Sequence, residues 1–237
     1  GRGNIAFSNK NERAPRMAER GTFGDEVRLE LELKTLADLG LIGYPNAGKS
    51  SLLSVISHAR PKIASYPFTT LRPYVGVVEL NNHDTFTVAD VPGLIEGAHE
   101  NIGLGHTFLR HIERAKALIY VLDAAGVDGR NPWSDLCVLQ RELESYLPGL
   151  SRRAGLILVN KIDLPESEAH INELRWRLED LYDKEGATPL TRAPIVELSC
   201  QSRTGVDEAI EAMYAVVQER RSVVMSKTTG KEVPKYY

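Results

Sequence analysis

Cysteine is scarce in this sequence of 237 residues, and so are long apolar runs and any excess of positive charge. The two cysteines, Cys137 and Cys200, are too few for a disulfide framework and badly spaced for zinc, so we read both as reduced thiols. No apolar run approaches the roughly 18–20 residues that cross a bilayer, and no secretory signal is visible. The formal net charge of −3 gives no overall basic field, which argues against a general nucleic-acid binder.

Two terminal segments differ in composition from the rest of the chain. Residues 1–36 are rich in Gly, Arg and Asn without an apolar period, so we expect loops, with a short closing strand possible at 27–33. Because the chain starts at Gly1 rather than Met, we expect the natural N-terminus and any targeting peptide to be missing. Residues 222–237 are polar and basic, and we expect a tail that is disordered or bound to a partner.

Between these segments, strand-like and helix-like patterns alternate. We expect strands at 36–43, 74–80, 85–91, 117–124, 155–160 and 193–199, and helices at 49–58, 104–117, 133–146, 168–184 and 205–221. The strand "ALIYVLDA" is an almost continuous apolar run, which is typical of a parallel sheet. The alternation predicts an α/β fold with a mostly parallel, doubly wound sheet, in which ligands bind at the carboxyl ends of the strands.

The stretch "GYPNAGKS" at 43–50 fits the pattern G-x-x-x-x-G-K-[ST], with an apolar strand before it and a helix after it, as a P-loop requires. The glycines allow a tight turn in which successive N–H groups point at one phosphate, and the helix N-terminus adds partial positive charge. Lys49 can reach the β- and γ-phosphates, and the Ser50 hydroxyl can bind Mg²⁺. We expect the nucleotide to contact Gly43, Pro45, Asn46, Ala47, Gly48, Lys49, Ser50 and Ser51.

The stretch "NKID" at 160–163 favours guanine over adenine. The Asp163 carboxylate can accept hydrogen bonds from the N1–H and the N2 amine of guanine, whereas adenine would leave its oxygens unpaired, which is costly. Asn160 can tie this segment to the P-loop, and the stem of Lys161 can cover a face of the base. The stretch "SCQ" follows the next strand and could close over guanine O6 with Ser199, Cys200 and Gln201.

Two further stretches are suited to the metal and the γ-phosphate. Asp90 of "DVPG" ends a strand and can hold Mg²⁺ through water, and Gly93 offers a backbone N–H to the γ-phosphate. In "YPFTTLRP" a threonine can bind Mg²⁺ while its N–H meets the γ-phosphate; we choose Thr70, with Thr69 as the alternative and Phe68 beside them. Release of both segments on hydrolysis would make a switch. The predicted metal ligands are Ser50, Thr70 and Asp90, and the predicted catalytic residues are Lys49, Thr70 and Gly93.

Together "GYPNAGKS", "YPFTTL", "DVPGLIEGAHENIGLGHTFLRHIERA" and "NKIDLP" resemble the Obg family of GTPases over roughly residues 1–220. The resemblance implies a Ras-like G domain at 37–221, preceded by the end of a glycine-rich Obg-type N-terminal domain at 1–36 and followed by a basic tail at 222–237, so that the chain would be a fragment. It also implies GTP or GDP and Mg²⁺ as ligands, with the large ribosomal subunit or its precursor as partner. The short tail, "GKSSLL" and "ASYPFTTL" look more like mitochondrial members, with a bacterial cytoplasm or a chloroplast as the alternative location.

Turnover is harder to predict than binding. Ras-like switches place a water-orienting glutamine after D-x-x-G, where this sequence has Leu94, so we expect slow intrinsic hydrolysis. In relatives with an Asn at the position of Asn46, that residue binds K⁺; here it is either such a ligand or a loop-stabilising side chain. Two functions follow: a GTPase whose cycle times its departure from a pre-ribosomal particle, or a GTP-loaded placeholder on rRNA that scarcely hydrolyses. Asp163 argues against a third, an ATP-using kinase.

Overall fold

The computed structural model of the chain describes residues 1–28, 37–63, 73–90, 114–127, 129–185 and 188–228, the last without the side chains of 223–228. By its contacts the chain divides into two units, Gly1–Leu33 and Lys34–Tyr237. In the first unit the described residues form one short 3-10 helix, η1 (Asn4–Phe7), and a hydrogen bond from Glu19 N to Arg2 O at 2.9 Å. Its assignment to an Obg-type glycine-rich domain stays a prediction.

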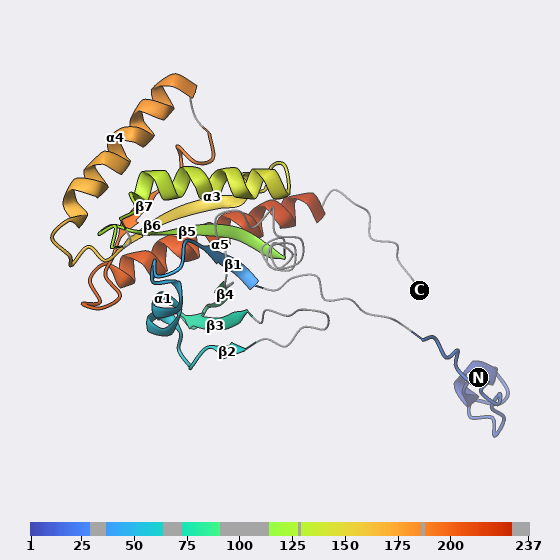
Figure 1. The fold of residues 1–237 in the computed structure, drawn as a ribbon. Helices are drawn as coiled ribbons and strands as arrows, with labels where there is room; N and C mark the ends of the chain where they lie inside the picture. The colour runs from blue at the N-terminus through green and yellow to red at the C-terminus, as the bar shows by residue number, and fades with distance from the viewer. Residues whose placement is uncertain (29–36, 64–72, 91–113, 128, 186–187, 229–237) are drawn as a thin grey trace. The chain divides into compact units, whose positions relative to one another are not determined.

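The second unit is built on a sheet of seven described strands in the order β2-β3-β4-β1-β5-β6-β7 (Figure 1). Strands β4, β1, β5, β6 and β7 run parallel, whereas β2 and β3 pair antiparallel at one edge. The predicted α/β fold with a mostly parallel sheet is therefore confirmed. The strands are β1 (Ala37–Ile42), β2 (Lys62–Ile63), β3 (Tyr74–Glu79), β4 (Thr85–Asp90), β5 (Ala115–Asp123), β6 (Ala154–Asn160) and β7 (Ile195–Glu197).

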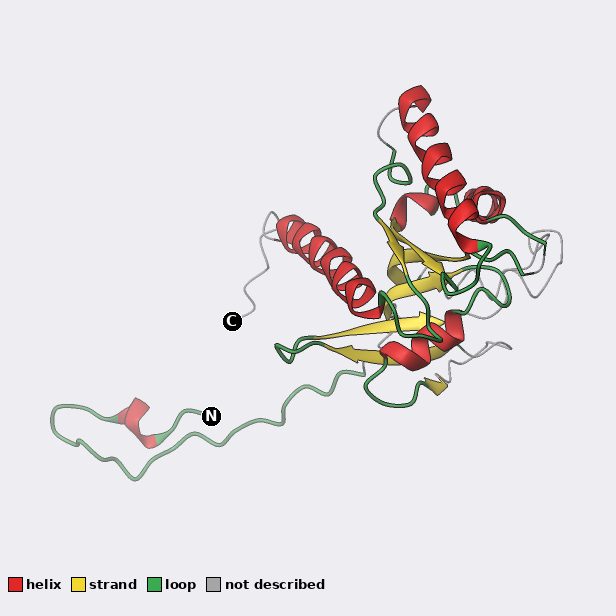
Figure 2. Ribbon diagram, turned by 90° about the vertical axis from the view of Figure 1, so that its left-hand side faces the viewer, coloured by secondary structure: helices red, strands yellow, loops and turns green. Residues whose placement is uncertain are grey.

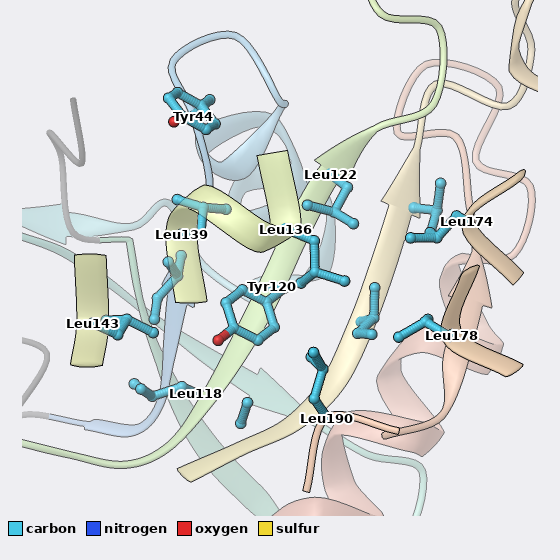
Figure 3. Close-up of a cluster of buried hydrophobic side chains, with 14 of the residues drawn as sticks. Tyr44, Leu118, Tyr120, Leu122, Leu136, Leu139, Leu143, Leu174, Leu178 and Leu190 are labelled. Carbon is cyan, nitrogen blue, oxygen red and sulfur yellow. The ribbon is translucent and has the colours of Figure 1, made fainter. Parts of the chain in front are cut away.

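Helices cover both faces of this sheet (Figures 1 and 2). The helices are α1 (Lys49–Ile56), α3 (Pro132–Tyr146), α4 (Ser167–Glu185), α5 (Val206–Thr228) and the short η2 (Ser151–Arg153). One buried cluster lies between the sheet and α3 and α4, with Tyr120, Leu136 and Leu174 among its members (Figure 3). A second cluster, which includes Leu52 and Met213, joins α1 and α5 to the opposite face.

Several predicted boundaries were wrong. The helix expected at 104–117 cannot include 115–117, which belong to β5, and residues 104–113 lie outside the described residues. Ala115 and Ala117 are buried while Lys116 is exposed, which is the two-residue period of a strand. Helix α5 continues past the expected end at 221 to Thr228, and the strand expected at 193–199 is confined to Ile195–Glu197. Strand β2 was missed because it has two residues. Val27 and Arg28 are not in a strand, and the rest of 27–33 is not described.

Candidate nucleotide-binding site

A cavity of about 730 Å³ lies at the carboxyl ends of the parallel strands. The loops that follow β1, β6 and β7 and the end of β4 all contribute to its wall. Thirteen of the predicted contact residues line it: Pro45, Asn46, Gly48, Lys49, Ser50, Ser51, Asp90, Asn160, Lys161, Asp163, Ser199, Cys200 and Gln201. Tyr74 and Leu164 also line it and were missed: Tyr74 lies just after "YPFTTLRP", and Leu164 belongs to "NKIDLP" but carries no polar group for a ligand. Phe68, Thr69, Thr70, Gly93 and Leu94 lie outside the described residues.

The phosphate loop is held by two glycines with different roles. Gly48 has φ +97°, a left-handed conformation that favours glycine, and a Cβ there would lie 2.1 Å from the Asn160 amide nitrogen. Gly43 has no positive φ; it is needed because a Cβ would lie 2.3 Å from the Val121 carbonyl oxygen. Gly48 thus serves the tight turn through its backbone conformation, whereas Gly43 allows the close approach of Val121. Gly43 and the buried Ala47 shape the loop without lining the cavity.

Lys49 begins helix α1, and its side chain folds back under the phosphate loop. Its ammonium donates to the carbonyl oxygens of Gly43 at 2.7 Å and Tyr44 at 2.8 Å. Burial lowers the pKa of Lys49, and the negative charge of Asp90 partly offsets this. An ammonium held this way, 9% exposed at the N-terminus of a helix, is placed to meet an anion without further desolvation of its own.

Ser50 and Asp90 form the end of the cavity suited to a metal. The Ser50 hydroxyl donates to Asp90 Oδ2 at 2.5 Å, and the Asp90 side chain is 3% exposed. Asp90 Oδ1 is buried and has no hydrogen-bond partner among the described residues, which is unusual for a carboxylate oxygen. This hydroxyl–carboxylate pair fits Mg²⁺, which takes few protein ligands and completes its shell with phosphate oxygens and water. No cluster of three or more His, Cys, Asp or Glu that could hold a metal occurs in the described part of the chain.

Asn160 connects the loops that surround the opposite end of the cavity. Its side-chain nitrogen donates to Ala47 O at 2.9 Å, and its side-chain oxygen accepts from Cys200 N at 3.1 Å. The expected tie between "NKID" and the phosphate loop is therefore present. Asp163 lines the cavity beside Cys200, and burial, reinforced by the Asp163 charge, raises the pKa of the Cys200 thiol to about 11.

Lys161 makes a contact that the sequence did not reveal. It has φ +70°, and its ammonium donates to Asp123 Oδ2 at 2.6 Å, at the end of β5. The expected cover of a base face can come only from the Lys161 stem, because the charged end is engaged with Asp123. Asp123 itself belongs to no recognised motif; the signal that could have revealed it is an acidic residue at the end of an apolar strand. Ser199 has a structural role: its hydroxyl accepts from Ser202 N at 3.1 Å.

A family model described as "50S ribosome-binding GTPase" matches residues 38–161, which include the phosphate loop, Asp90 and Asn160. The chain belongs to this family. The "GTPase Obg" of Roseiflexus castenholzii is 49% identical over 219 residues, which are 92% of this chain and 47% of that protein. The "GTPase Obg" of Chloroflexus aggregans is 60% identical over 168 residues, 71% of this chain and 38% of that protein. The chain thus spans about half the length of the relatives it matches, and the predicted resemblance to the Obg family is confirmed.

Solved structures support the fold of the second unit. The G domain of the T. maritima FeoB iron transporter matches with a TM-score of 0.53 at 21% identity, over 75% of this chain and 96% of that one. A GDP-bound mutant of S. thermophilus NFeoB matches with a TM-score of 0.53 at 22% identity, over 75% and 61% of the two chains. These likenesses confirm the Ras-like G domain as a fold. Among the described helices, none has the length and apolar character to cross a membrane.

Proposed function

We propose that this GTPase binds GTP in the cavity at the strand ends, hydrolyses it to GDP and phosphate, and acts as a switch in assembly of the large ribosomal subunit. The observation that carries the proposal is the convergence of Lys49, Asp90 and Asp163 on one cavity in a chain that matches a 50S ribosome-binding GTPase family. Each residue fits a different part of one ligand: the phosphates, the metal and the base.

The phosphates enter where the chain offers fixed positive charge. Lys49 is held by two backbone carbonyls and can turn its remaining N–H toward the β- and γ-phosphates. Successive N–H groups of the loop after Gly43 and the start of α1 supply further donors. Ser50 and Asp90 would hold Mg²⁺, which when bound neutralises charge that develops on the phosphates. Asp163 would fix guanine, and Asn160 would keep the base loop and the phosphate loop at one separation.

Hydrolysis in the isolated chain is proposed to be slow. Leu94 stands where a water-orienting glutamine occurs in Ras-like switches, and its side chain cannot hydrogen-bond water. The missing transition-state stabilisation would come from a partner, from Thr70 in a rearranged switch, or from a K⁺ held by Asn46, which lines the cavity with φ +63°. A partner of ribosomal origin fits the family description.

The alternative function is a GTP-loaded placeholder on pre-ribosomal rRNA with little hydrolysis, and Leu94 is the observation that favours it.

The proposal also includes the cellular compartment. The relatives named above are bacterial, which supports the bacterial cytoplasm over the mitochondrial matrix or a chloroplast.

Multiple-turnover phosphate release, measured with and without purified large ribosomal subunits, separates these functions. We expect a basal rate on the order of 10⁻⁴ s⁻¹, as for an unassisted Ras-like switch, and strong stimulation by the particles. Leu94→Ala should leave the basal rate nearly unchanged, and Thr70→Ala should abolish stimulation. Tight particle binding in GTP without stimulated release would establish the placeholder instead, and a fast basal rate lost in Leu94→Ala would contradict the role assigned to Leu94.

A further inference from the structure

The phosphate loop is anchored on both faces of the sheet by two of its own side chains. Tyr44 belongs to the buried cluster beneath α3, whose side chains Figure 3 draws, and is 6% exposed. Ala47 belongs to the cluster beneath α1 and α5 and is 2% exposed. Ala47 is fixed further by the Asn160 amide. The position of the first half of the loop therefore depends on what holds Tyr44.

Arg130 is packed directly on Tyr44. The guanidinium carbon lies 4.0 Å from the centroid of the Tyr44 ring, the geometry of a cation–π contact. The same guanidinium lies 3.6 Å from a carboxylate oxygen of Asp135, which is buried in the first turn of α3. Asn131 caps this helix by accepting from Trp133 N at 2.9 Å, so the acidic partner stands on an ordered helix end. Arg130 thus joins the phosphate loop to the start of α3.

The segment that carries Arg130 is tightly constructed. Gly126 has φ +63°, and a Cβ there would lie 2.3 Å from the carbonyl oxygen of Arg130. A turn closes between Gly129 N and Gly126 O at 2.8 Å. At the other end of the segment, Asp123 accepts from Ala125 N at 3.0 Å and from the Lys161 ammonium at 2.6 Å. The described residues of one connection, 123–127 and 129–131, therefore contact both the base loop and the phosphate loop.

The carbonyl of Tyr44 makes this packing relevant to nucleotide binding. It accepts from the Lys49 ammonium at 2.8 Å and from Ala47 N at 3.3 Å, so a shift of Tyr44 moves the group that meets the phosphates. We propose that Arg130 is a positioning residue for nucleotide binding, which holds Tyr44 and thereby preorganises the phosphate loop and Lys49. This inference rests on nucleotide binding in the cavity and is independent of the ribosomal role.

The test compares ligands that differ only in phosphate. GDP, GMP and guanosine compete with a fluorescent GDP analogue for the 237-residue chain, and the ratio of the GMP to the GDP dissociation constant reports how well the loop grips the β-phosphate. In Arg130→Gln we expect this ratio to fall about threefold to tenfold, since a partly exposed cation–π contact is modest and the Arg130 side chain is 40% exposed. Binding of guanosine should stay unchanged.

Matched variants isolate the contact. Tyr44→Phe keeps the ring and should keep the ratio, whereas Tyr44→Leu should lower it as Arg130→Gln does, with no further loss in the double variant. Arg175→Gln removes an arginine of comparable exposure that pairs with Glu197 and does not line the cavity, so it should leave the ratio unchanged. If Arg130→Gln does not fold, Arg130→Lys takes its place. Lysine keeps the positive charge but lacks the planar guanidinium, so we expect a smaller fall of the ratio.

Two results would overturn the proposal. One is an unchanged ratio in Arg130→Gln, whatever its melting temperature; a lower melting temperature would then make Arg130 a purely structural residue. The other is additive losses in the double variant, which would show that Arg130 does not act through Tyr44. Failure of the unmodified chain to bind GDP at all would instead count against the proposed function.

Discussion

Asn160 bonds to both sides of the cavity with one side chain, donating to the carbonyl of Ala47 at 2.9 Å and accepting from the backbone nitrogen of Cys200 at 3.1 Å. Asn160 is 3% exposed, so neither bond can be replaced readily by water. The amide nitrogen also occupies the space that a Cβ of residue 48 would need, which links Gly48 to Asn160 sterically. The phosphate loop and both base loops therefore behave as one unit.

Asn160→Ala is expected to lower both stability and affinity. It leaves the carbonyl of Ala47, in a buried bond, and the backbone nitrogen of Cys200, in a partly buried one, without their partner, which should reduce the free energy of unfolding by about 2 kcal/mol. It also frees the phosphate loop, which should weaken GDP binding tenfold or more by the relation of about 1.4 kcal/mol per decade. Urea unfolding and GDP titration measure the two effects. Asn82→Ala, in an exposed turn where Asn82 bonds to Asp84, should change neither. Wild-type GDP affinity in Asn160→Ala would contradict the coupling.

Asp163→Asn should change which base is bound. The substitution replaces one acceptor oxygen with a donor that faces the N2 amine of guanine, so GTP affinity should fall roughly tenfold or more. Xanthine carries an oxygen at that position, and xanthosine triphosphate should gain affinity relative to GTP. Competition titrations with both nucleotides measure the exchange. If Asp163→Asn binds GTP as the parent does, Asp163 is not the residue that recognises the base.

Asp90→Asn tests the metal end of the cavity. One oxygen of the Asp90 carboxylate accepts from the Ser50 hydroxyl, and the other is buried without a partner among the described residues. Asparagine has nearly the same shape as aspartate, so the variant removes the negative charge that favours Mg²⁺ with little other change. In the parent, chelation of Mg²⁺ with EDTA should weaken GTP binding tenfold or more. In Asp90→Asn the same treatment should have little effect, since the metal contribution is already lost. An equal loss on chelation in both proteins would place the metal on other ligands.

The sequence predicted the residues that line the cavity better than the contacts that hold them in place. Motifs at strand ends located Asn46, Asp90 and Asp163, because parallel strands bring their carboxyl ends to one edge of the sheet. The contacts of Asp123 with Lys161 and of Arg130 with Tyr44 were out of reach, because these partners are distant in sequence and become neighbours only through strand order and a glycine-dependent turn. The helix expected over 115–117 failed because these residues pair with β1 in the sheet, a tertiary contact that local sequence does not reveal.

Potassium should accelerate hydrolysis if Asn46 is a ligand. The residue stands in the left-handed region at φ +63° and lines the cavity, where a monovalent cation would add positive charge beside the phosphates. We expect faster phosphate release in K⁺ than in Na⁺ at equal ionic strength. The difference should disappear in Asn46→Ala. Equal rates in the two salts would leave Asn46 as a loop-stabilising side chain.

Cys200 should be a slow thiol despite its place in the cavity wall. Burial, with the Asp163 charge as a second cause, raises its pKa from 9.0 to about 11. At pH 8 the thiolate fraction is then about one in a thousand instead of about one in ten, and because the thiolate is the nucleophile, alkylation should be about 100-fold slower than in the unfolded chain. Iodoacetamide kinetics on Cys137→Ser, which leaves a single thiol, measure this directly.

The pH profile of that reaction separates the two causes of the raised pKa. A raised pKa means that the reactive thiolate appears only as the pH approaches about 11, so the alkylation rate should climb about tenfold per pH unit between pH 8 and pH 10. Asp163→Asn in the Cys137→Ser background removes the negative charge but leaves the burial, and should shift the profile to lower pH without restoring the rate of the unfolded chain. Bound GDP should protect Cys200 from alkylation, since Cys200 lines the cavity in which we propose that GDP binds. A profile with its midpoint near 9 in the folded protein, unmoved by Asp163→Asn, would mean that the thiol is neither desolvated nor close to Asp163.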